Sequence, residues 1–536
     1  MAETVTLTPS VSQISELSEN KGPINRILLI FQSTIQLDEL SIVGDESNRF
    51  QKNEDVAGVE YPLIKINDYI FSQSEITNFN IDCTEFLPKI NLSVLLTSQL
   101  FLAKEMPKDG DLISVSICNK SDVLRIIRND YVITGVHVSP NMTEVKGPVM
   151  ISFYGELFIP GLKSQKNDFS FEGTTLEAAK DFAKRYGLGF ATNEDNTDDK
   201  QIWLKANIAG DIYINNLVER AWRDTKSFYK CWIDVYYNLN FININKQLMS
   251  AETSSDVAAM ISNIDKNWNY GNSRDEEETT LAVKVFSNIQ SFRTSSFYIT
   301  SWRPLNRSSQ VTFQIGTKMT CEIFEHNKYI YENPKTEKNK NYWRIPIEPT
   351  YDEDKVNKTI LLRGRATMVP DEKNPDLQRA NYSYVDLYEK FPWLGVQYTL
   401  TNSDADISEW DGNHHKNYQR AKVQNLINNK ELDKLNLHVK VNGNNFNVII
   451  ADKIPVILIR TDAIDNMRIN PESNFNDSLD LFYSGWYLVK GFILNWNQKN
   501  EDSIMSRFTH EFILTRREWP APLPIEPIKV NEKKLD

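Results

Sequence analysis

The stretch Phe169-Ser-Phe-Glu-Gly-Thr-Thr-Leu-Glu-Ala-Ala179 decides how the rest of the chain divides into domains. Thr174 and Glu177 have the spacing of a capping box, in which each side chain binds the backbone N–H of the other residue at a helix N-terminus. This spacing predicts a helix that starts just after Thr174. Apolar residues then recur at helical intervals up to Tyr186, and Gly187 follows as a left-handed helix stop.

Further short elements are expected after this helix. Leu188–Ala191 is an apolar run behind the helix stop and predicts a strand. A second helix is expected to begin at Asn216-Leu-Val-Glu219, where Asn216 supplies a cap. The apolar spacing from Phe228 to Tyr236 predicts a third helix, which leads into a strand from Leu239 to Ile244. We therefore expect residues 165–250 to form a small α/β subdomain.

The composition is that of a large, folded and acidic chain. Its 536 residues are enough for roughly three or four domains of ordinary size. Lys and Arg number 60 and Asp and Glu number 72, which gives a net charge of −12. This excess argues against a protein that coats nucleic acid or binds an anionic membrane surface. Aromatic residues make up 11% of the chain, which is too many for a disordered protein.

The cysteines and the N-terminus indicate the cellular compartment in which the protein is made. The four cysteines lie far apart without a C-x-x-C pair, so the sequence indicates neither a disulfide framework nor a zinc knuckle. Met1–Pro9 lacks a basic start followed by an apolar run, and no stretch approaches the roughly 20 apolar residues of a membrane span. We expect a protein that is made in the cytoplasm and has no membrane span. The cysteines are Cys83, Cys118, Cys231 and Cys321.

Strands are predicted on both sides of the α/β subdomain. Residues 23–164 show period-two alternation and turn residues, which predict one antiparallel β-barrel or sandwich. Residues 296–330 and 435–520 together predict a second barrel, in which Asn442-Gly443 is a hairpin turn. The expected strands of the first barrel are Ile27–Phe31, Ile76–Cys83, Ile90–Val94, Leu112–Ile117, Tyr131–Val138 and Val149–Ile159. Those of the second are Phe297–Thr300, Val311–Ile315, Met319–Phe324, Leu435–Val441, Phe446–Ile450, Ile454–Ile459, Trp486–Trp496 and Arg507–Arg516.

The remaining segments are polar and less regular. Residues 1–22 are expected to be a flexible arm, and residues 521–536 an extended proline-rich tail. Residues 251–295 are expected to be a polar linker or helical segment. The insertion 331–434 contains a long polar helix near 417–434, and its exposed face is a candidate assembly contact.

Two acidic or histidine-containing sets are candidate metal ligands. The first offers carboxylate oxygens for a hard cation but lacks the twelve-residue calcium loop with its central glycine. The second contains adjacent histidines in a loop before a helix, where histidines more often lie at a surface or an interface. We therefore expect no metal and no cofactor. The two sets are Asp195, Asp198 and Asp199, and Asp411, His414 and His415.

Signals for an enzyme are weak. His510 alternates with Phe508 and Phe512 on a strand, which predicts a core or interface histidine. Glu276 and Glu278 lie in a charge run, where a raised carboxyl pKa is not expected. A serine nucleophile elbow, a P-loop and an H-E-x-x-H motif are all missing from the sequence. We expect no catalytic residues.

Several stretches resemble hub proteins of contractile phage tails, the group of late control protein D and the hub part of type VI secretion spikes. One set of three stretches is similar to the subdomain inserted between the two barrels of such hubs, and two later stretches look like their closing hairpin. The resemblance covers about 165–250 and 390–520 in detail and 27–161 only in strand rhythm. The stretches are Gly173–Ala179, Tyr186–Phe190 and Ser227–Ile233 for the insert, Ser484–Ile493 and Phe508–Arg517 for the hairpin, and Trp393–Gln397 and His415–Ala421 as further matches.

This resemblance implies both a fold and a role. The fold is α+β but mainly β, with two tail-tube-like antiparallel β-barrels, an inserted small α/β subdomain and irregular polar insertions. The role is that of a structural virion protein in the tail baseplate. Three copies would form a pseudo-sixfold ring that joins the sixfold tail tube to the threefold central spike. Its neighbours would be the tube, spike, tape measure and baseplate wedge proteins, and DNA would cross its channel without sequence-specific binding.

Two alternatives belong to other classes of protein. One is a tail-associated cell-wall hydrolase whose catalytic domain is formed by residues 255–380. Two converging carboxylates in a cleft would indicate it. The other is a glycan- or receptor-binding tail protein in which Trp268, Tyr270 and Trp302 form a sugar platform, and glycan binding by the isolated chain would support it.

Overall fold

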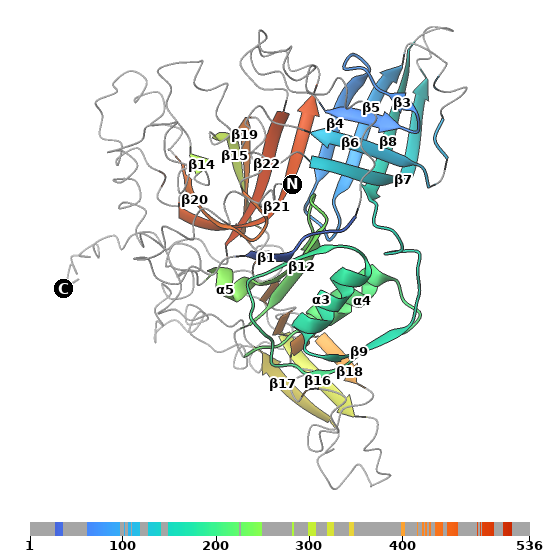
Figure 1. The fold of residues 1–536 in the computed structure, drawn as a ribbon. Coiled ribbons are helices and arrows are strands. Elements are labelled where there is room, and N and C mark those ends of the chain that lie inside the picture. The colour runs from blue at the N-terminus through green and yellow to red at the C-terminus, as the bar shows by residue number, and fades with distance from the viewer. Residues whose placement is uncertain are drawn as a thin grey trace, which may run out of the picture.

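The protein contains one large, mainly antiparallel sheet and a smaller α/β subdomain below it (Figure 1). The computed structural model describes residues 27–35, 62–96, 110–117, 127–140, 148–224, 227–248, 435–442, 448–458, 485–497 and 508–516, together with shorter segments between them. The fold is mainly β, as the sequence predicts. The division of the chain into the domain ranges given above stays a prediction.

The main sheet has 13 strands and runs through both β regions of the chain. Its order is β15–β19–β22–β21–β4–β5–β8–β7–β6–β2–β3, with β20 also paired to β21 and β14 paired to β20. The strands of the first region are β2 Leu63–Ile66, β3 Tyr69–Ile70, β4 Ile76–Asp82, β5 Lys89–Leu96, β6 Leu112–Ile117, β7 Ile127–Pro140 and β8 Val149–Leu157. Those of the second are β14 Leu281–Ala282, β15 Ile299–Asn306, β19 Leu435–Asn442, β20 Lys453–Ile457, β21 Gly485–Asn497 and β22 Phe508–Arg516.

The two β regions meet edge to edge at β4 and β21, which lie side by side in Figure 1. Ile81 of β4 is opposite Leu494 of β21, and Phe79 is opposite Trp496. All four side chains are buried. The sequence predicts two β regions, and the structure adds that they share one hydrogen-bonded ladder and one core.

The insert lies against this sheet and has its own four-stranded sheet, in the order β1–β10–β13–β12, with α3 and α4 beside it (Figure 1). A two-stranded ribbon of β9 and β11 completes it. We use the name insert for these elements. They are β1 Leu28–Phe31, β9 Phe169–Gly173, α3 Thr175–Arg185, β10 Gly189–Thr192, β11 Gln201–Lys205, α4 Gly210–Glu219, β12 Tyr229–Ile233, β13 Asn238–Asn243 and α5 Ile244–Leu248.

The start of α3 has the capping box that the sequence predicts. The Glu177 N–H donates to the Thr174 hydroxyl at 3.3 Å, and the Thr174 N–H donates to the Glu177 carboxylate at 2.9 Å. Gly187 has a φ of 67° and ends the helix in the left-handed conformation. β10 follows immediately, so the predicted helix–strand unit is confirmed.

Two predicted helices of the insert are wrong. α4 ends at Glu219, where the sequence predicts a helix to begin. Its true start at Gly210 was missed because the N-cap, Ala209, makes no side-chain cap bond. The predicted helix from Phe228 to Tyr236 is instead strand β12 and a turn. Its residues 231–233 are all buried, so both faces of the strand are apolar and no period of two is visible in the sequence.

Strand Leu28–Phe31 pairs differently from the expectation. It runs antiparallel to β10 of the insert, with Leu28 opposite Thr192, rather than joining the barrel of residues 23–164. The Thr34 N–H then donates to the Gly187 carbonyl at 2.8 Å, which ties the end of β1 to the helix stop of α3. The first apolar run of the chain therefore forms an edge of the insert sheet.

Two expectations for the second β region also fail. Met319–Glu325, strand β16, pairs with β17 Tyr342–Ile347 and β18 Tyr398–Asn402 in a separate three-stranded sheet. Val448–Ile450 lies in a turn rather than in a return strand, and β19 pairs with β15 and β22. The predicted strand Val311–Ile315 lies outside the described residues.

Candidate functional site

The solvent-facing side of the main sheet carries a polar row that crosses the junction of β4 and β21. Its members lie directly opposite one another on successive strands, and we call this row the charged rung. Along it, Lys440 is opposite Glu511, and Lys89 lies between Asp82 and Glu156, so each ammonium group has a carboxylate beside it. From β15 to β8 the charged rung consists of Ser301, Lys440, Glu511, Ile493, Asp82, Lys89 and Glu156.

A second row, the amide rung, lies next to the charged rung on the same side of the sheet. It contains three asparagines and ends at Tyr154, whose side chain is 46% exposed. Hydrophobic side chains occupy the opposite face, because successive residues of a strand alternate between the two faces. The amide rung consists of Thr509, Asn495, Asn80, Asn91 and Tyr154.

Ion pairs hold the charges of this face close to neutral. The Glu511 carboxylate lies 2.9 Å from His438 Nδ1 and 3.8 Å from an Arg303 guanidinium nitrogen. The hydrogen bond to His438 lowers the pKa of Glu511, so this carboxylate stays ionised. At the other end of the rung Lys89 binds Glu85, and that hydrogen bond raises the pKa of Lys89.

The insert is fixed to the main sheet by polar contacts to backbone carbonyls. The Lys230 ammonium donates to the Lys490 carbonyl at 2.9 Å, and Lys490 is the extra residue of a bulge in β21. The Gln247 amide donates to the Ala451 carbonyl at 3.0 Å, and the Lys453 ammonium to the Leu248 carbonyl at 3.1 Å. These contacts join β12 and α5 of the insert to strands or turns of the second β region.

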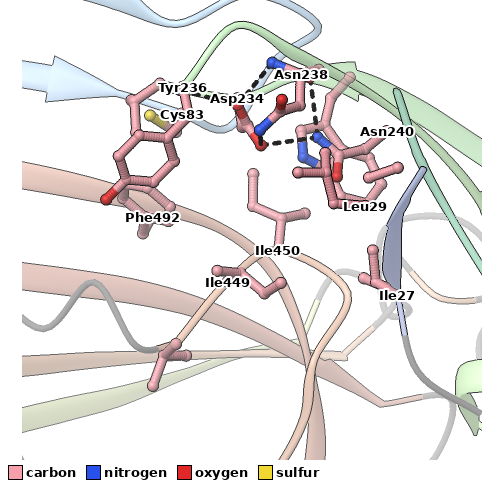
Figure 2. Close-up of a pocket in the computed structure, with 14 residues that line it drawn as sticks. Ile27, Leu29, Cys83, Asp234, Tyr236, Asn238, Asn240, Ile449, Ile450 and Phe492 are labelled. Atoms are coloured by element: carbon pink, nitrogen blue, oxygen red, sulfur yellow. Dashed lines mark hydrogen bonds between the residues drawn. The ribbon is translucent and has the colours of Figure 1, made fainter. Parts of the chain in front are cut away.

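A small cavity of about 70 Å³ lies where the insert, the main sheet and the turn before β20 meet (Figure 2). Asp234 lies at one side and accepts hydrogen bonds from the Tyr236 and Asn238 N–H groups at 2.8 and 2.9 Å. The Asn240 side chain donates to it at 3.2 Å. Burial raises the pKa of Asp234, while these donors oppose that rise. The other lining residues in Figure 2 are mostly apolar, so the cavity is a packing junction of the insert.

A helical segment with buried amides closes the open edge of the insert. The described residues 421, 422, 424, 425, 428, 429 and 432 are helical, and we call these residues the amide helix. Asn425 donates to the Glu219 and Ala221 carbonyls at 3.0 and 2.9 Å and accepts from the Tyr229 N–H at 2.8 Å. Gln424 donates to the Ser227 carbonyl at 2.7 Å. The sequence predicts this helix, but Asn and Gln side chains face inward where it predicts an assembly face.

The candidate calcium ligands do not converge. Asp195 and Asp198 are exposed, whereas Asp199 is fully buried. The Asp199 carboxylate accepts from the N–H groups of Thr175 and Trp222, both at 2.8 Å. Burial raises the pKa of Asp199 despite these donors. It therefore fixes the start of α3 to the loop after α4 and is not available to a cation.

Sequence reasoning missed Glu194, a buried carboxylate of the insert with four polar partners. Its side chain is completely buried, binds Arg223, and accepts from the Lys246 ammonium at 2.7 Å and from the Asn243 amide at 2.5 Å. The Tyr229 hydroxyl lies 3.5 Å away. The partners are 29 to 52 residues away in sequence, so no local spacing could indicate them.

The remaining candidate residues are structural or lie outside the described residues. His415 is buried, and its N–H donates to the Gln201 side chain at 3.3 Å. His510 is a core histidine, as predicted, and burial lowers its pKa to about 3. Trp302 is half-buried against Tyr483, with ring centroids 5.2 Å apart. The residues that the structure does not describe are Asp411, His414, Glu276, Glu278, Trp268 and Tyr270.

Within the described part of the chain, no group of three His, Cys, Asp or Glu side chains is placed to hold a metal ion. Cys83 and Cys231 are buried free thiols, and burial raises the pKa of both. Among the helices that are described, none is both long and apolar enough to cross a bilayer.

Comparison with known proteins finds similar chains among the solved structures. Neither a protein-family model nor a curated protein matches the chain. A tail protein from Neisseria meningitidis MC58 is 11% identical with a TM-score of 0.41, covering 85% of this chain and 97% of its own. A 43 kDa tail protein of prophage MuSo2 from Shewanella oneidensis is 11% identical with a TM-score of 0.45, covering 85% and 98%.

A third similar structure is a component of the E. coli type VI secretion system, which itself has structural similarity to the T4 bacteriophage tail proteins gp27 and gp5. It is 7% identical with a TM-score of 0.35, covering 86% of this chain and 79% of its own. All three TM-scores lie below 0.5, so the function proposed below rests on the contacts and sequence of this chain. These three similar structures are thus a tail protein, a prophage tail protein and a type VI secretion component.

Proposed function

We propose that the protein is a structural component of a contractile phage tail, a baseplate hub without enzymatic activity. Three copies form a pseudo-sixfold ring between the tail tube and the central spike, with the tape measure and wedge proteins as further neighbours. Each copy contributes two β regions to this ring. The single observation that supports this most is the charged rung, which continues from one β region to the other with Ile493 as its apolar member at the junction.

The chemistry of this face suits a passage for DNA. Phosphates bind proteins mainly through Lys and Arg, which displace the counterions of DNA. In the charged rung Lys89 and Lys440 each lie opposite a carboxylate on the next strand, so DNA phosphates would have to compete with these carboxylates for the two lysines. The amide rung beside it carries no charge. We propose that this face lines the channel and lets DNA pass without retention.

The oligomeric state tests the proposal directly. Native mass spectrometry of the full chain, alone and with a candidate spike protein, should give a trimer that binds one spike assembly. A stable monomer that associates with no tube, spike or wedge protein would refute the hub. Symmetry gives the physical reason for three copies, because a threefold ring of duplicated units can match a sixfold tube on one side and a threefold spike on the other.

A further inference from the structure

The corner between β13 and α5 places a lysine and an asparagine on the two oxygens of one buried carboxylate. The carboxylate belongs to Glu194, whose side chain has no exposed surface. Its Oε2 accepts from the Lys246 ammonium at 2.7 Å, and its Oε1 accepts from the Asn243 carboxamide at 2.5 Å. Because both oxygens belong to one small planar group, the ammonium and the carboxamide are held close to each other.

A backbone donor polarises the carbonyl of the Asn243 side chain. Asn243 is the last residue of β13 and directly precedes α5, and its Oδ1 accepts from the Lys246 N–H at 3.4 Å. A hydrogen bond to a carbonyl oxygen stabilises the negative charge that develops there when a nucleophile attacks the carbon. The Nδ2 of the same carboxamide is bound to Glu194, so the group is held at both of its polar atoms.

Lys246, Glu194 and Asn243 supply a nucleophile, a base and an electrophile. An activated nucleophile lies within hydrogen-bond reach of a base, and a third group orients that base. Here the amine lies 2.7 Å from the carboxylate, and Arg223 binds the same carboxylate and orients it. Asn243 is 2% exposed, whereas the Lys246 side chain is 20% exposed. Bulk water is therefore kept from the carboxamide, while a small leaving group has a way out along the lysine.

We propose that Lys246 and Asn243 react with each other to form an isopeptide bond. Glu194 takes a proton from the Lys246 ammonium, and the freed amine attacks Cγ of Asn243. A bond forms between Nζ and Cγ, and the bond between Cγ and Nδ2 breaks. Both protons that Nζ loses pass over Glu194 to Nδ2, so that ammonium leaves and the carboxylate is regenerated.

The folded chain itself promotes this reaction and is stabilised by its product. The reaction needs no oxidant, reductant or cofactor, and the fold holds the reacting groups together, so no entropy is lost in bringing them together. The new bond closes the corner between β13 and α5, where a short helix would otherwise fray. α5 carries contacts between the insert and the second β region, through Gln247 and Leu248, and the closed corner keeps these contacts in place.

Peptide mass spectrometry of the purified full chain tests the bond directly. Trypsin should fail to cleave after Lys246, because the acylated lysine no longer carries the charge that the protease recognises. The uncleaved peptide that begins at Cys231 should be about 17 Da lighter than its sequence requires, since one ammonia is lost. Hydroxylamine distinguishes the isopeptide from a succinimide at Asn243. The succinimide has the same mass, but hydroxylamine opens it, and Lys246 remains cleavable.

Conservative variants separate the chemistry from the fold. Lys246→Arg keeps a cation beside Glu194, and Asn243→Ser keeps a cap for α5, but neither can form the bond. Both variants should give peptides of unchanged mass that trypsin cleaves after residue 246. Lys230→Arg alters a lysine outside the site and should retain the full mass loss. Complete cleavage after Lys246 with an unchanged peptide mass in the parent chain, or a mass loss that persists in Lys246→Arg, would overturn the proposal.

Discussion

Glu194 is the residue on which the polar interior of the insert depends. Its buried carboxylate is shared by Arg223 and Lys246. Replacing it by glutamine removes the counter-charge that the two cations share, and removal of one partner from a buried ion pair is strongly destabilising. Because both cations reach solvent in part, we expect Glu194→Gln to lower the free energy of unfolding by roughly 2 kcal/mol. Denaturant unfolding, monitored by Trp fluorescence, measures this change in the free energy of unfolding.

The neighbouring Asp195 provides the matched control. It is exposed, so Asp195→Asn should change the free energy of unfolding by no more than about 0.5 kcal/mol. If the two variants were equally stable, the network around Glu194 would contribute nothing to folding.

Asp452 should make stability depend on pH. Burial raises its pKa to about 7, although the Ile449 N–H donates to it at 3.0 Å. A carboxyl whose pKa is higher in the folded state favours folding when protonated, so its contribution is complete below about pH 4 and is lost as pH rises through 7. Asp452→Asn keeps the acceptor but cannot ionise. We expect the variant to melt at a higher temperature than the parent at pH 8, with little difference at pH 4.

One result would contradict the titration of Asp452. A constant difference in melting temperature from pH 4 to pH 8 would mean that Asp452 does not titrate in this range. Asp480 is a suitable control. Its carboxylate accepts from the Tyr483 N–H in a similar turn contact, at 3.0 Å.

Among the elements, the amide helix depends on side-chain hydrogen bonds for its place. Asn425 satisfies the backbone of both α4 and β12. Asn425→Ala leaves those buried groups unpaired, which costs about 1–3 kcal/mol for each unsatisfied group. We expect hydrogen exchange at the Tyr229 amide to accelerate by tenfold or more. Asn429→Ala removes one contact to the Tyr229 carbonyl and should have a smaller effect on that amide.

Helices and strands of this protein could be predicted from the sequence where their signals are local. α3 was predictable because its signals are local: Thr174 and Glu177 are three residues apart, and Gly187 stops the helix. α4 begins without such a cap, and β12 is buried on both faces, so its apolar residues carry no period. The inward amides of the amide helix could not be predicted, because their partners lie about 200 residues earlier in the chain. Strands β4, β5, β6, β8, β21 and β22 correspond to stretches that the sequence predicts as strands.

At the scale of the whole molecule, the junction of β4 and β21 should make the two β regions unfold together. Trp496 is completely buried there, opposite Phe79. Trp496→Ala should cost about 3–5 kcal/mol, since a large core side chain is removed. Hydrogen exchange should show β5 and β22 losing protection at the same denaturant concentration, earlier than in the parent.

Trp302 gives the matched control at the end of the same sheet. It is half-buried on β15, so Trp302→Ala should destabilise the protein far less and leave the junction intact. Separate loss of protection in β5 and β22 of the parent protein would contradict a shared core.

The pairing of β4 with β21 also determines how long β4 must wait for its partner during synthesis of the chain. β4 pairs with a strand that lies about 410 residues later in the chain, Asp82 being opposite Ile493. At roughly 5 to 20 residues per second, a ribosome needs on the order of 20 to 80 s to deliver that partner. Throughout this interval the nascent chain carries an uncovered strand edge, which invites pairing with other nascent chains. Translation speed and chaperone supply should therefore govern the yield of this protein more than they govern proteins whose strands pair with near neighbours.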